Sequence, residues 1–330
     1  MSDPARRERT VPAEDAGAVV AARPELGGGS ATPSFALPAG ALDGLPGPLG
    51  ETRIGPRTFR WGERTYVMGI LNVTPDSFSG DGLLPPDGRA SGGQRWIDAS
   101  VAQAHAMASE GADLLDVGGE STRPGHAAVD PDEEARRVVP VLRAVRDALP
   151  SMPLTIDTTK PSVAEAAIAA GAAGINDVWG VSDDDTLARV AAAHGIPIIL
   201  MHNRAEPRYV NLVPEVVGEL QRAIDRALAA GVRWENVLVD PGFGFGKTPD
   251  QNLALLGELG SLRLLGRPIV LGTSRKSTLG KVLDLPPEER VEATVATTAL
   301  GIAAGVDVVR VHDVRANARA ARMADAVIRR

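Results

Sequence analysis

Short apolar runs alternate with alanine-rich helical stretches along most of the chain. A glycine placed as a helix C-cap stands ahead of most runs, for example Gly111, Gly171 and Gly195. Nearly continuous apolar strands that alternate with helices are typical of parallel sheets covered on both faces. Eight such runs predict a (β/α)8 TIM barrel, with a doubly wound open sheet as the alternative because periodicity does not show closure. The runs are residues 67–71, 114–117, 154–156, 174–175, 196–201, 237–239, 268–271 and 306–311.

The part of the chain ahead of the first run has a different character. Residues 1–50 are rich in Ala, Pro and Gly, a composition that buries too little apolar surface to fold alone, so we expect a disordered extension. Within residues 58–66, two short extended pieces on either side of Gly62-Glu63 predict a β-hairpin that leads into the first strand. Residues 51–330 then match the ~250 residues typical of a single barrel domain.

Composition excludes several classes of protein. The chain has 330 residues, a net charge of −7 and no cysteine. The lack of cysteine excludes disulfides, thiolate metal sites and cysteine nucleophiles, and the negative charge argues against a nucleic-acid surface. No apolar run reaches the ~20 residues of a membrane span, and the charged N-terminus lacks the apolar segment of a signal peptide. We therefore expect a cytoplasmic protein without nucleic-acid or membrane partners.

Polar residues follow nearly every predicted strand, at the end of the barrel where active sites lie. Asp157, Asn176 and Asp240 come from central strands and suit a planar ring with N–H donors on its edge, which a carboxylate can bind with two parallel hydrogen bonds. Basic residues come from the last two strands, where barrels often bind phosphate. We predict a donor-bearing ring at the barrel centre with a phosphate group nearby. The other strand-end residues include Asn72, Asp116, Arg123, Met201, His202, Lys276, Arg310 and His312.

One loop combines unusual residues, because positions 240–247 hold a carboxylate, three glycines and two of the five phenylalanines of the chain. Glycine lets the backbone approach a ligand and an aromatic ring offers a flat apolar face, although a Gly-rich surface loop is the simpler alternative. Lys247 does not end a Walker loop, since Pro241 stands at the first glycine position. Two Gly-rich stretches, residues 80–93 and 118–131, are candidate lids. No cluster has the spacing of a zinc site, whereas Mg²⁺ held by substrate phosphates needs only one Asn or Asp.

Eight segments together resemble the dihydropteroate synthase family, and they occur in the order of that family over roughly residues 52–330. Each segment alone is weak evidence, whereas the ordered set is specific. The segments are residues 68–79 (MGILNVTPDSFS), 116–125 (DVGGESTRPG), 156–158 (IDT), 175–177 (IND), 200–202 (LMH), 240–247 (DPGFGFGK), 274–277 (SRKS) and 310–313 (RVHD).

The resemblance implies a transferase of folate biosynthesis. Such an enzyme joins 4-aminobenzoate to (7,8-dihydropterin-6-yl)methyl diphosphate and releases 7,8-dihydropteroate and diphosphate. The resemblance also implies Mg²⁺, with Asn72 as its ligand, and a homodimer through outer helices. The residues that it assigns are Asp157, Lys276 and Arg310 as catalytic; Asp157, Asn176, Met201, Asp240, Phe245 and Lys276 for the pterin; Thr122, Arg123, Pro124 and Ser277 for 4-aminobenzoate; and Asn72, Arg310 and His312 for the diphosphate.

The chain departs from the family pattern in two loops. The first loop is one residue longer, which leaves open whether Asp76 or Asp81 approaches the magnesium ion. Asn203 and Arg204 stand where many members have Met and Gln. Two other functions also stay open. A pterin-dependent methyltransferase that serves a corrinoid would share the acceptor residues but not need the basic ones, and a catalytically silent paralogue would bind the pterin only.

Overall fold

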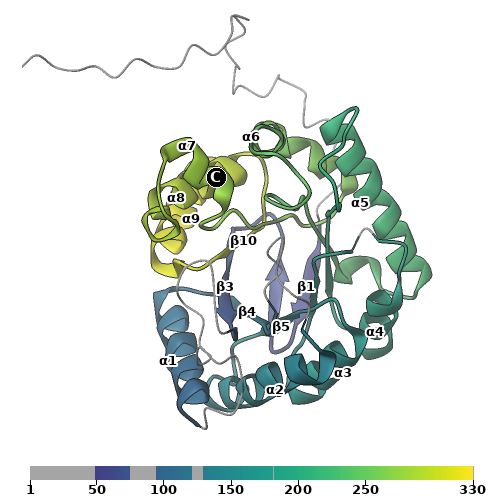
Figure 1. The fold of residues 1–330 in the computed structure, drawn as a ribbon, viewed down its shortest axis with the longest axis vertical. Helices are drawn as coiled ribbons and strands as arrows, with labels where there is room; N and C mark the ends of the chain where they lie inside the picture. The colour runs from purple at the N-terminus through teal and green to yellow at the C-terminus, as the bar shows by residue number, and fades with distance from the viewer. Residues whose placement is uncertain (1–48, 75–93, 121–128, 181, 330) are drawn as a thin grey trace, which may run out of the picture. The chain divides into compact units, whose positions relative to one another are not determined.

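Eight parallel strands form the centre of the molecule, in a computed structural model that describes residues 49–74, 94–120, 129–180 and 182–329. Their order in the sheet is β8-β7-β6-β5-β4-β3-β10-β9. A parallel bridge between Val239, in β8, and Ile269, just ahead of β9, joins the two edges and closes the sheet. Helices surround the strands (Figure 1). The predicted TIM barrel is therefore confirmed, and the open-sheet alternative is wrong.

Strands and helices alternate as the apolar pattern predicts. Several strands run one residue past their apolar run because a polar residue still belongs to the ladder, whereas β9 has only two residues. The strands of the barrel are β3 (Tyr66–Asn72), β4 (Leu114–Gly118), β5 (Leu154–Asp157), β6 (Ile175–Asp177), β7 (Ile198–Met201), β8 (Val237–Asp240), β9 (Val270–Leu271) and β10 (Val308–Val311). The helices are α1 (Gln94–Glu110), α2 (Pro131–Ala148), α3 (Pro161–Ala170), α4 (Thr186–His194), α5 (Leu212–Ala229), α6 (Pro249–Gly257), α7 (Ser277–Leu283), α8 (Val291–Ala303) and α9 (Val314–Ile328).

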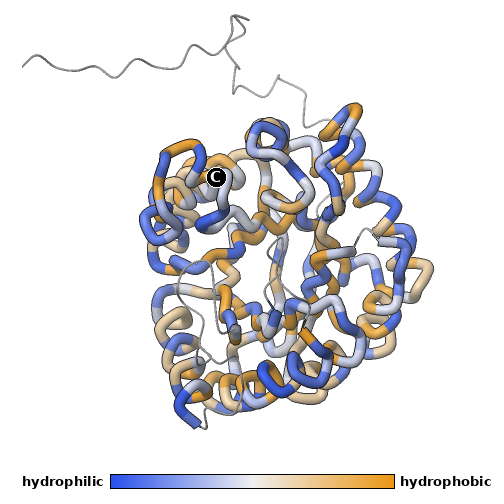
Figure 2. Tube along the Cα trace, viewed as in Figure 1, coloured by the Kyte–Doolittle hydropathy of each residue, from blue (hydrophilic) through white to orange (hydrophobic). Residues whose placement is uncertain are grey.

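Helices α1, α2, α4, α5 and α9 pack against the strands. In α5 the buried residues Val213, Val216 and Leu220 recur at spacings of three and four, which places them on one face. Gly171 and Gly195 end α3 and α4 with φ of 121° and 64°, in agreement with the predicted glycine caps. Figure 2 shows mainly hydrophobic strands and helices that alternate between hydrophobic and hydrophilic turns. Among the described helices, none is long and apolar enough to cross a membrane.

A β-hairpin precedes the barrel, but its predicted position was wrong. Its strands are β1 (Glu51–Ile54) and β2 (Arg57–Arg60), which pair antiparallel. The turn lies at Gly55-Pro56, where Gly55 has φ 54° and proline fixes the next φ, a strong turn signal that outweighs Gly62-Glu63. Tyr66 pairs with Val308 of the barrel instead of with the hairpin.

The hairpin closes the N-terminal end of the barrel with apolar side chains. Phe59 and Trp61 are buried, and the ring of Tyr66 lies 4.8 Å and 5.5 Å from their centroids. These rings pack on residues near the start of the barrel strands, among them Met68 and Leu114. Because this end is filled and apolar, the polar side chains of the barrel interior gather at the opposite, C-terminal end.

Some predicted features lie outside the described residues. They are residues 1–48 of the N-terminal extension, the candidate lid over residues 80–93 and the central part, residues 121–128, of the other candidate lid.

Candidate active site

Three acceptor residues predicted from the strand ends lie on the central strands of the barrel. Asp157 ends β5, Asn176 is the middle residue of β6, and the two are paired in register. Asp240 ends β8 and is paired with Met201 at the end of β7. All four side chains belong to buried residues with exposed fractions below 10%. The structure thus brings the predicted acceptors and Met201 together at the C-terminal end of the barrel.

Asp116 links these acceptors to the predicted phosphate side of the site. Asp116 is fully buried in the middle of β4. Its carboxylate accepts hydrogen bonds from Thr155 and from Nδ2 of Asn176, the latter at 2.9 Å. Nε of Arg310 donates to Oδ2 of Asp116 at 2.7 Å. The sequence placed Asp116 among the strand-end residues without giving it a role. The available signal was its position between buried apolar residues, because a buried carboxylate needs partners.

Arg310 also contacts Asp157, since its Nη2 donates to Oδ2 at 2.7 Å. The other oxygen, Oδ1 of Asp157, is buried and has no hydrogen-bond partner among the described residues. Burial raises the pKa of Asp157 to about 7, although the charge of Arg310 opposes the shift. Because Nδ2 of Asn176 donates to Asp116, its Oδ1 is left as an acceptor. Asp157 therefore presents a buried oxygen without a described donor, and its partner in register, Asn176, presents an acceptor oxygen.

The loop after β8 supplies the opposite wall of the site. Oδ1 of Asp240 accepts from the backbone N–H of Gly242 at 2.7 Å. Its Oδ2 and Nζ of Lys276 both lie within 3.9 Å of the position that a Cβ would take at Gly272. Nζ of Lys276 also donates to the Phe243 carbonyl and lies 4.4 Å from the centroid of the Phe245 ring. A carboxylate, an ammonium group and an aromatic face thus stand side by side.

Lys276 and Asp240 both titrate away from their ordinary ranges. Burial lowers the pKa of Lys276 to about 8, although Asp240 opposes this shift. Burial raises the pKa of Asp240, although Lys276 opposes it. Displaced pKa values of this kind are frequent at functional sites, because such sites hold charged groups away from water.

The phosphate side is formed by the strands next to β10. Asn72 ends β3, and its Oδ1 lies with Oδ2 of Asp157 within 4.0 Å of the position of a Cβ at Gly118. His312 follows β10, with Nδ1 2.9 Å from Oγ of Ser274, which also accepts from the His312 backbone N–H at 3.1 Å. The Ser274 hydroxyl therefore holds the His312 ring in place through both contacts.

The residues expected on the 4-aminobenzoate side are only partly described. Ser277 is exposed and begins α7. Thr122, Arg123 and Pro124 lie outside the described residues, as do Asp76 and Asp81. The described part of the chain contains no group of three or more His, Asp and Glu side chains that could hold a metal ion.

Comparison with known proteins agrees with this geometry. A family model described as a pterin-binding enzyme matches residues 68–312. The chain is 50% identical to a dihydropteroate synthase of Clostridium beijerinckii over 279 residues, which are 84% of this chain and all of that protein. A dihydropteroate synthase of Clostridium difficile, solved in the presence of pteroic acid, has a TM-score of 0.76 and 46% identity, and the match covers 82% of this chain and all of that one. A Xanthomonas albilineans dihydropteroate synthase with 4-aminobenzoic acid has a TM-score of 0.75 and 40% identity, and the match covers 84% of this chain and 97% of that one.

The closed barrel and the family match over most of the chain place it in the pterin-binding class of enzymes. Within that class, the chain belongs to the dihydropteroate synthase family.

Replacing Asp116 tests the buried charge network. Asp116→Asn places an amide N–H against three donors and should lower the free energy of unfolding by about 3 kcal/mol, because it breaks a buried ion pair. The matched control is Asp147→Asn, which acts on the exposed pair with Arg146 and should cost less than about 1 kcal/mol. Urea unfolding followed by circular dichroism measures both. Equal losses in the two variants would contradict the structural role of Asp116.

Proposed function

We propose that the chain condenses (7,8-dihydropterin-6-yl)methyl diphosphate with 4-aminobenzoate, giving 7,8-dihydropteroate and diphosphate. One observation carries this proposal: the buried Oδ1 of Asp157 lacks a partner among the described residues, and Asn176, the residue paired with Asp157 on the next strand, presents an acceptor oxygen. Such oxygens favour a ligand with several N–H donors on one edge, and a pterin has that edge. The names of the relatives and the ligands of the solved neighbours support the same reaction.

The pterin would bind between the acceptors and the loop after β8. Asp157, Asn176 and Asp240 accept hydrogen bonds from its ring edge. Phe245 provides a flat apolar face, and Met201 fills the neighbouring buried position. Lys276 stands over the Phe245 ring beside Asp240, where its ammonium group donates to a ring acceptor.

The diphosphate would lie on the side of Asn72, Arg310 and His312. Arg310 occupies a position between the two parts of the substrate, because its guanidinium contacts Asp157 and comes from the strand beside β3. A guanidinium presents donors in a fixed fork that suits phosphate oxygens. Ser277, exposed at the rim, suits the second substrate, and the roles of Thr122, Arg123 and Pro124 on that side stay predictions.

Mg²⁺ fits this site only as an ion carried mainly by the substrate. Among the described residues, Asn72 offers an amide oxygen, Oδ1, and no group of three or more His, Asp and Glu side chains could hold the ion alone. A magnesium ion often takes one or two protein ligands and completes its shell with phosphate oxygens and water. When bound, it would supply positive charge to the diphosphate group.

The residues of the chain would act as follows. The leaving diphosphate takes the electron pair of the C–O bond, and Arg310 and His312 provide donors where its negative charge grows. Asp157 stabilises the positive charge that spreads from the exocyclic carbon into the dihydropterin. The neutral amine of 4-aminobenzoate forms the C–N bond and loses one proton. The reaction needs no protein nucleophile.

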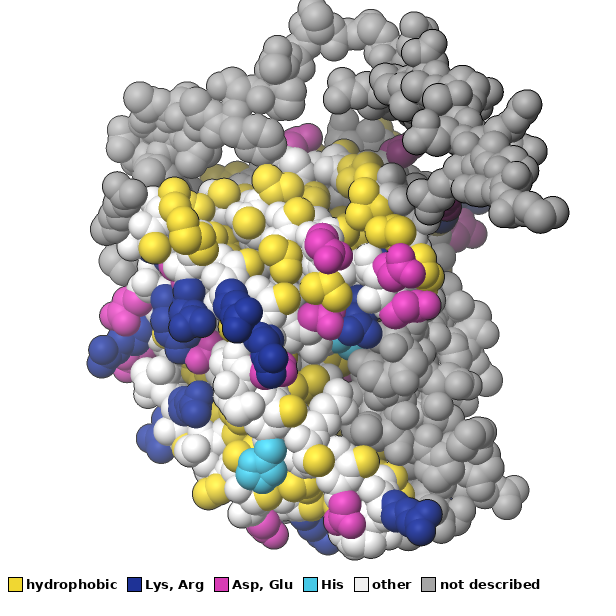
Figure 3. Space-filling view, turned by 90° about the vertical axis from the view of Figure 1, so that its left-hand side faces the viewer, with side chains coloured by type: hydrophobic (Ala, Val, Ile, Leu, Met, Phe, Trp, Pro, Cys, Tyr) yellow, Lys and Arg dark blue, Asp and Glu magenta, His cyan; other side chains and the backbone are white. Residues whose placement is uncertain are grey.

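A homodimer and a cytoplasmic location stay predictions of the family resemblance. Exposed apolar side chains on α7 and α8, namely Val282, Leu283 and Leu300, support an association through outer helices. Figure 3 faces this side of the barrel and shows hydrophobic side chains gathered in its upper part.

An assay of diphosphate release tests the proposed reaction. Release should require 4-aminobenzoate, because the amine completes the reaction. Asp157→Asn should lower kcat by about 100-fold or more, since it removes a charge aimed at the transition state. Asp225→Asn, an exposed position on α5, should leave kcat unchanged. A protein that binds the pterin without releasing diphosphate would be the silent paralogue, and methyl transfer without diphosphate release would identify the methyltransferase.

The pH profile tests the charges of Asp157 and Lys276. Asp157 must be ionised and Lys276 protonated, so kcat/KM for the pterin substrate should fall below the Asp157 pKa of about 7 and above the Lys276 pKa of about 8. Lys276→Arg should move the alkaline limb to higher pH, because arginine keeps its charge. Where turnover is too slow, pterin affinity gives the same profile. Lys281→Arg, exposed on α7, serves as the control. An alkaline limb unchanged in Lys276→Arg would refute the assignment.

A further inference from the structure

Lys247 is a partly buried lysine that the proposed reaction does not use, and burial lowers its pKa to about 7. Its Nζ contacts three acceptors, each at 3.0 Å: the carbonyl oxygens of Gly242 and Phe245, and Nδ1 of His202. An ammonium group has three protons, so these three contacts use its donor capacity in full. Two of the acceptors belong to residues 242–246, which we call the β8 loop. Lys247 therefore holds the loop that carries Phe245 and has no donor left for a phosphate.

The third acceptor, His202, connects Lys247 to α5. The His202 side chain is fully buried, and burial lowers its pKa to about 3, so the ring is neutral. Since Nδ1 accepts from Lys247, the ring proton belongs on Nε2, which lies 2.9 Å from Oε2 of Glu219 in a close contact without hydrogen-bond geometry. A chain of contacts thus runs from the β8 loop through Lys247 and the buried His202 to a carboxylate of α5.

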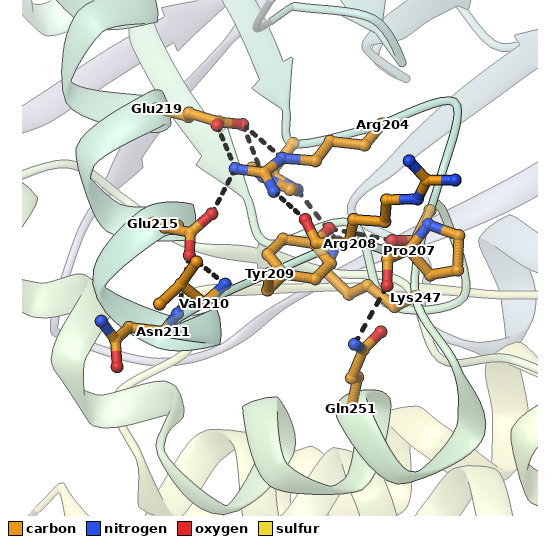
Figure 4. Close-up of polar contacts among 12 residues, drawn as sticks. Arg204, Pro207, Arg208, Tyr209, Val210, Asn211, Glu215, Glu219, Lys247 and Gln251 are labelled. Atoms are coloured by element: carbon orange, nitrogen blue, oxygen red, sulfur yellow. Dashed lines mark hydrogen bonds and ion pairs between the residues drawn. The ribbon is translucent and has the colours of Figure 1, made fainter.

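Arg204 and Tyr209 connect α5 back to the same loop (Figure 4). Arg204 donates to Glu219 through Nε at 3.2 Å and to Glu215 through Nη2 at 2.8 Å. Its guanidinium lies 4.2 Å from the centroid of the Tyr209 ring, whose hydroxyl donates to the Gly246 carbonyl at 2.9 Å. Three carbonyls of the β8 loop are therefore bound by side chains of this network.

The backbone of the β8 loop also lies directly on residues 202–204. A Cβ at Gly242 would stand 1.8 Å from the His202 carbonyl oxygen, and one at Gly246 would stand 2.3 Å from that of Arg204. Both glycines have positive φ, 67° and 55°. This close backbone packing therefore sets the position of the loop, and the side-chain network stabilises that position.

We propose that Lys247 is a positioning residue for the pterin pocket, acting through the β8 loop and not on the reacting atoms. This inference rests on the proposed function. The position of the loop determines where the Phe245 ring stands, and it also determines where Lys276 lies, because Lys276 binds the Phe243 carbonyl and covers that ring. Loss of the Lys247 ammonium would remove one donor from each of two loop carbonyls and from His202, and the Gly242 carbonyl would keep only its bond from the Phe245 backbone N–H.

Kinetics on Lys247→Met test this inference, because methionine keeps much of the apolar stem and removes the three donors. We expect the KM for the pterin diphosphate, and its dissociation constant measured by calorimetry, to rise about tenfold or more. The KM for 4-aminobenzoate should stay within about twofold, because none of the residues assigned to that side belongs to the loop. Lys281→Met, exposed on α7, is the matched control and should change neither constant.

Tyr209→Phe tests the contact between the network and the Gly246 carbonyl. It provides the test of the positioning role if Lys247→Met does not fold. It removes one hydroxyl bond to the Gly246 carbonyl, and we expect a rise of about threefold in the pterin KM with the 4-aminobenzoate KM unchanged. Folding is verified by the thermal unfolding midpoint.

Two results would overturn the positioning role: pterin affinity within twofold of the parent protein in a folded Lys247→Met, or equal losses for both substrates. If Lys247→Met does not fold, unchanged pterin KM in Tyr209→Phe would overturn it. If the parent protein itself released no diphosphate, the proposed function would fail instead, and direct pterin binding would still report on the loop.

Discussion

The guanidinium of Arg310 between the carboxylates of Asp116 and Asp157 is the interaction on which the site depends. Both carboxylates belong to buried residues of neighbouring strands, β4 and β5, and each is held at 2.7 Å. Buried charges are tolerated only where partners compensate them. Here the compensation is complete for Asp116 and incomplete for Asp157, whose second oxygen has no described partner. The network thus stabilises the barrel mouth and leaves an acceptor ready for a ligand.

The N-terminal end of the barrel contributes to stability, and the C-terminal end carries the groups for binding. The hairpin fills the N-terminal end with Phe59 and Trp61, which excludes water from the strand starts. At the C-terminal end, hydrogen bonds from neighbouring side chains hold the polar groups in fixed positions. Asp116 holds Asn176 in this way, and Lys247 holds the β8 loop. Such second contacts matter because binding groups must already stand in place when the substrate arrives.

Much of the fold and of the site could be predicted from the sequence, because both follow from local patterns. The apolar runs give the strands, and the barrel rule places Asp157, Asn176 and Asp240 at one end. The role of Asp116 was missed because it depends on Arg310, which lies far along the chain. The hairpin was misplaced because two turn signals competed within a few residues. The Lys247 network depends on contacts with α5 that no local pattern shows.

A structure of the protein with the dihydropterin diphosphate bound tests the central claim most directly. We predict the ring edge within hydrogen-bond distance of Oδ1 of Asp157, with Asn176 and Asp240 as the other acceptors and the diphosphate beside Arg310. Arg310 should keep its contact with Asp116. A substrate bound at this mouth without contact to Asp157, or bound elsewhere on the barrel, would contradict the account.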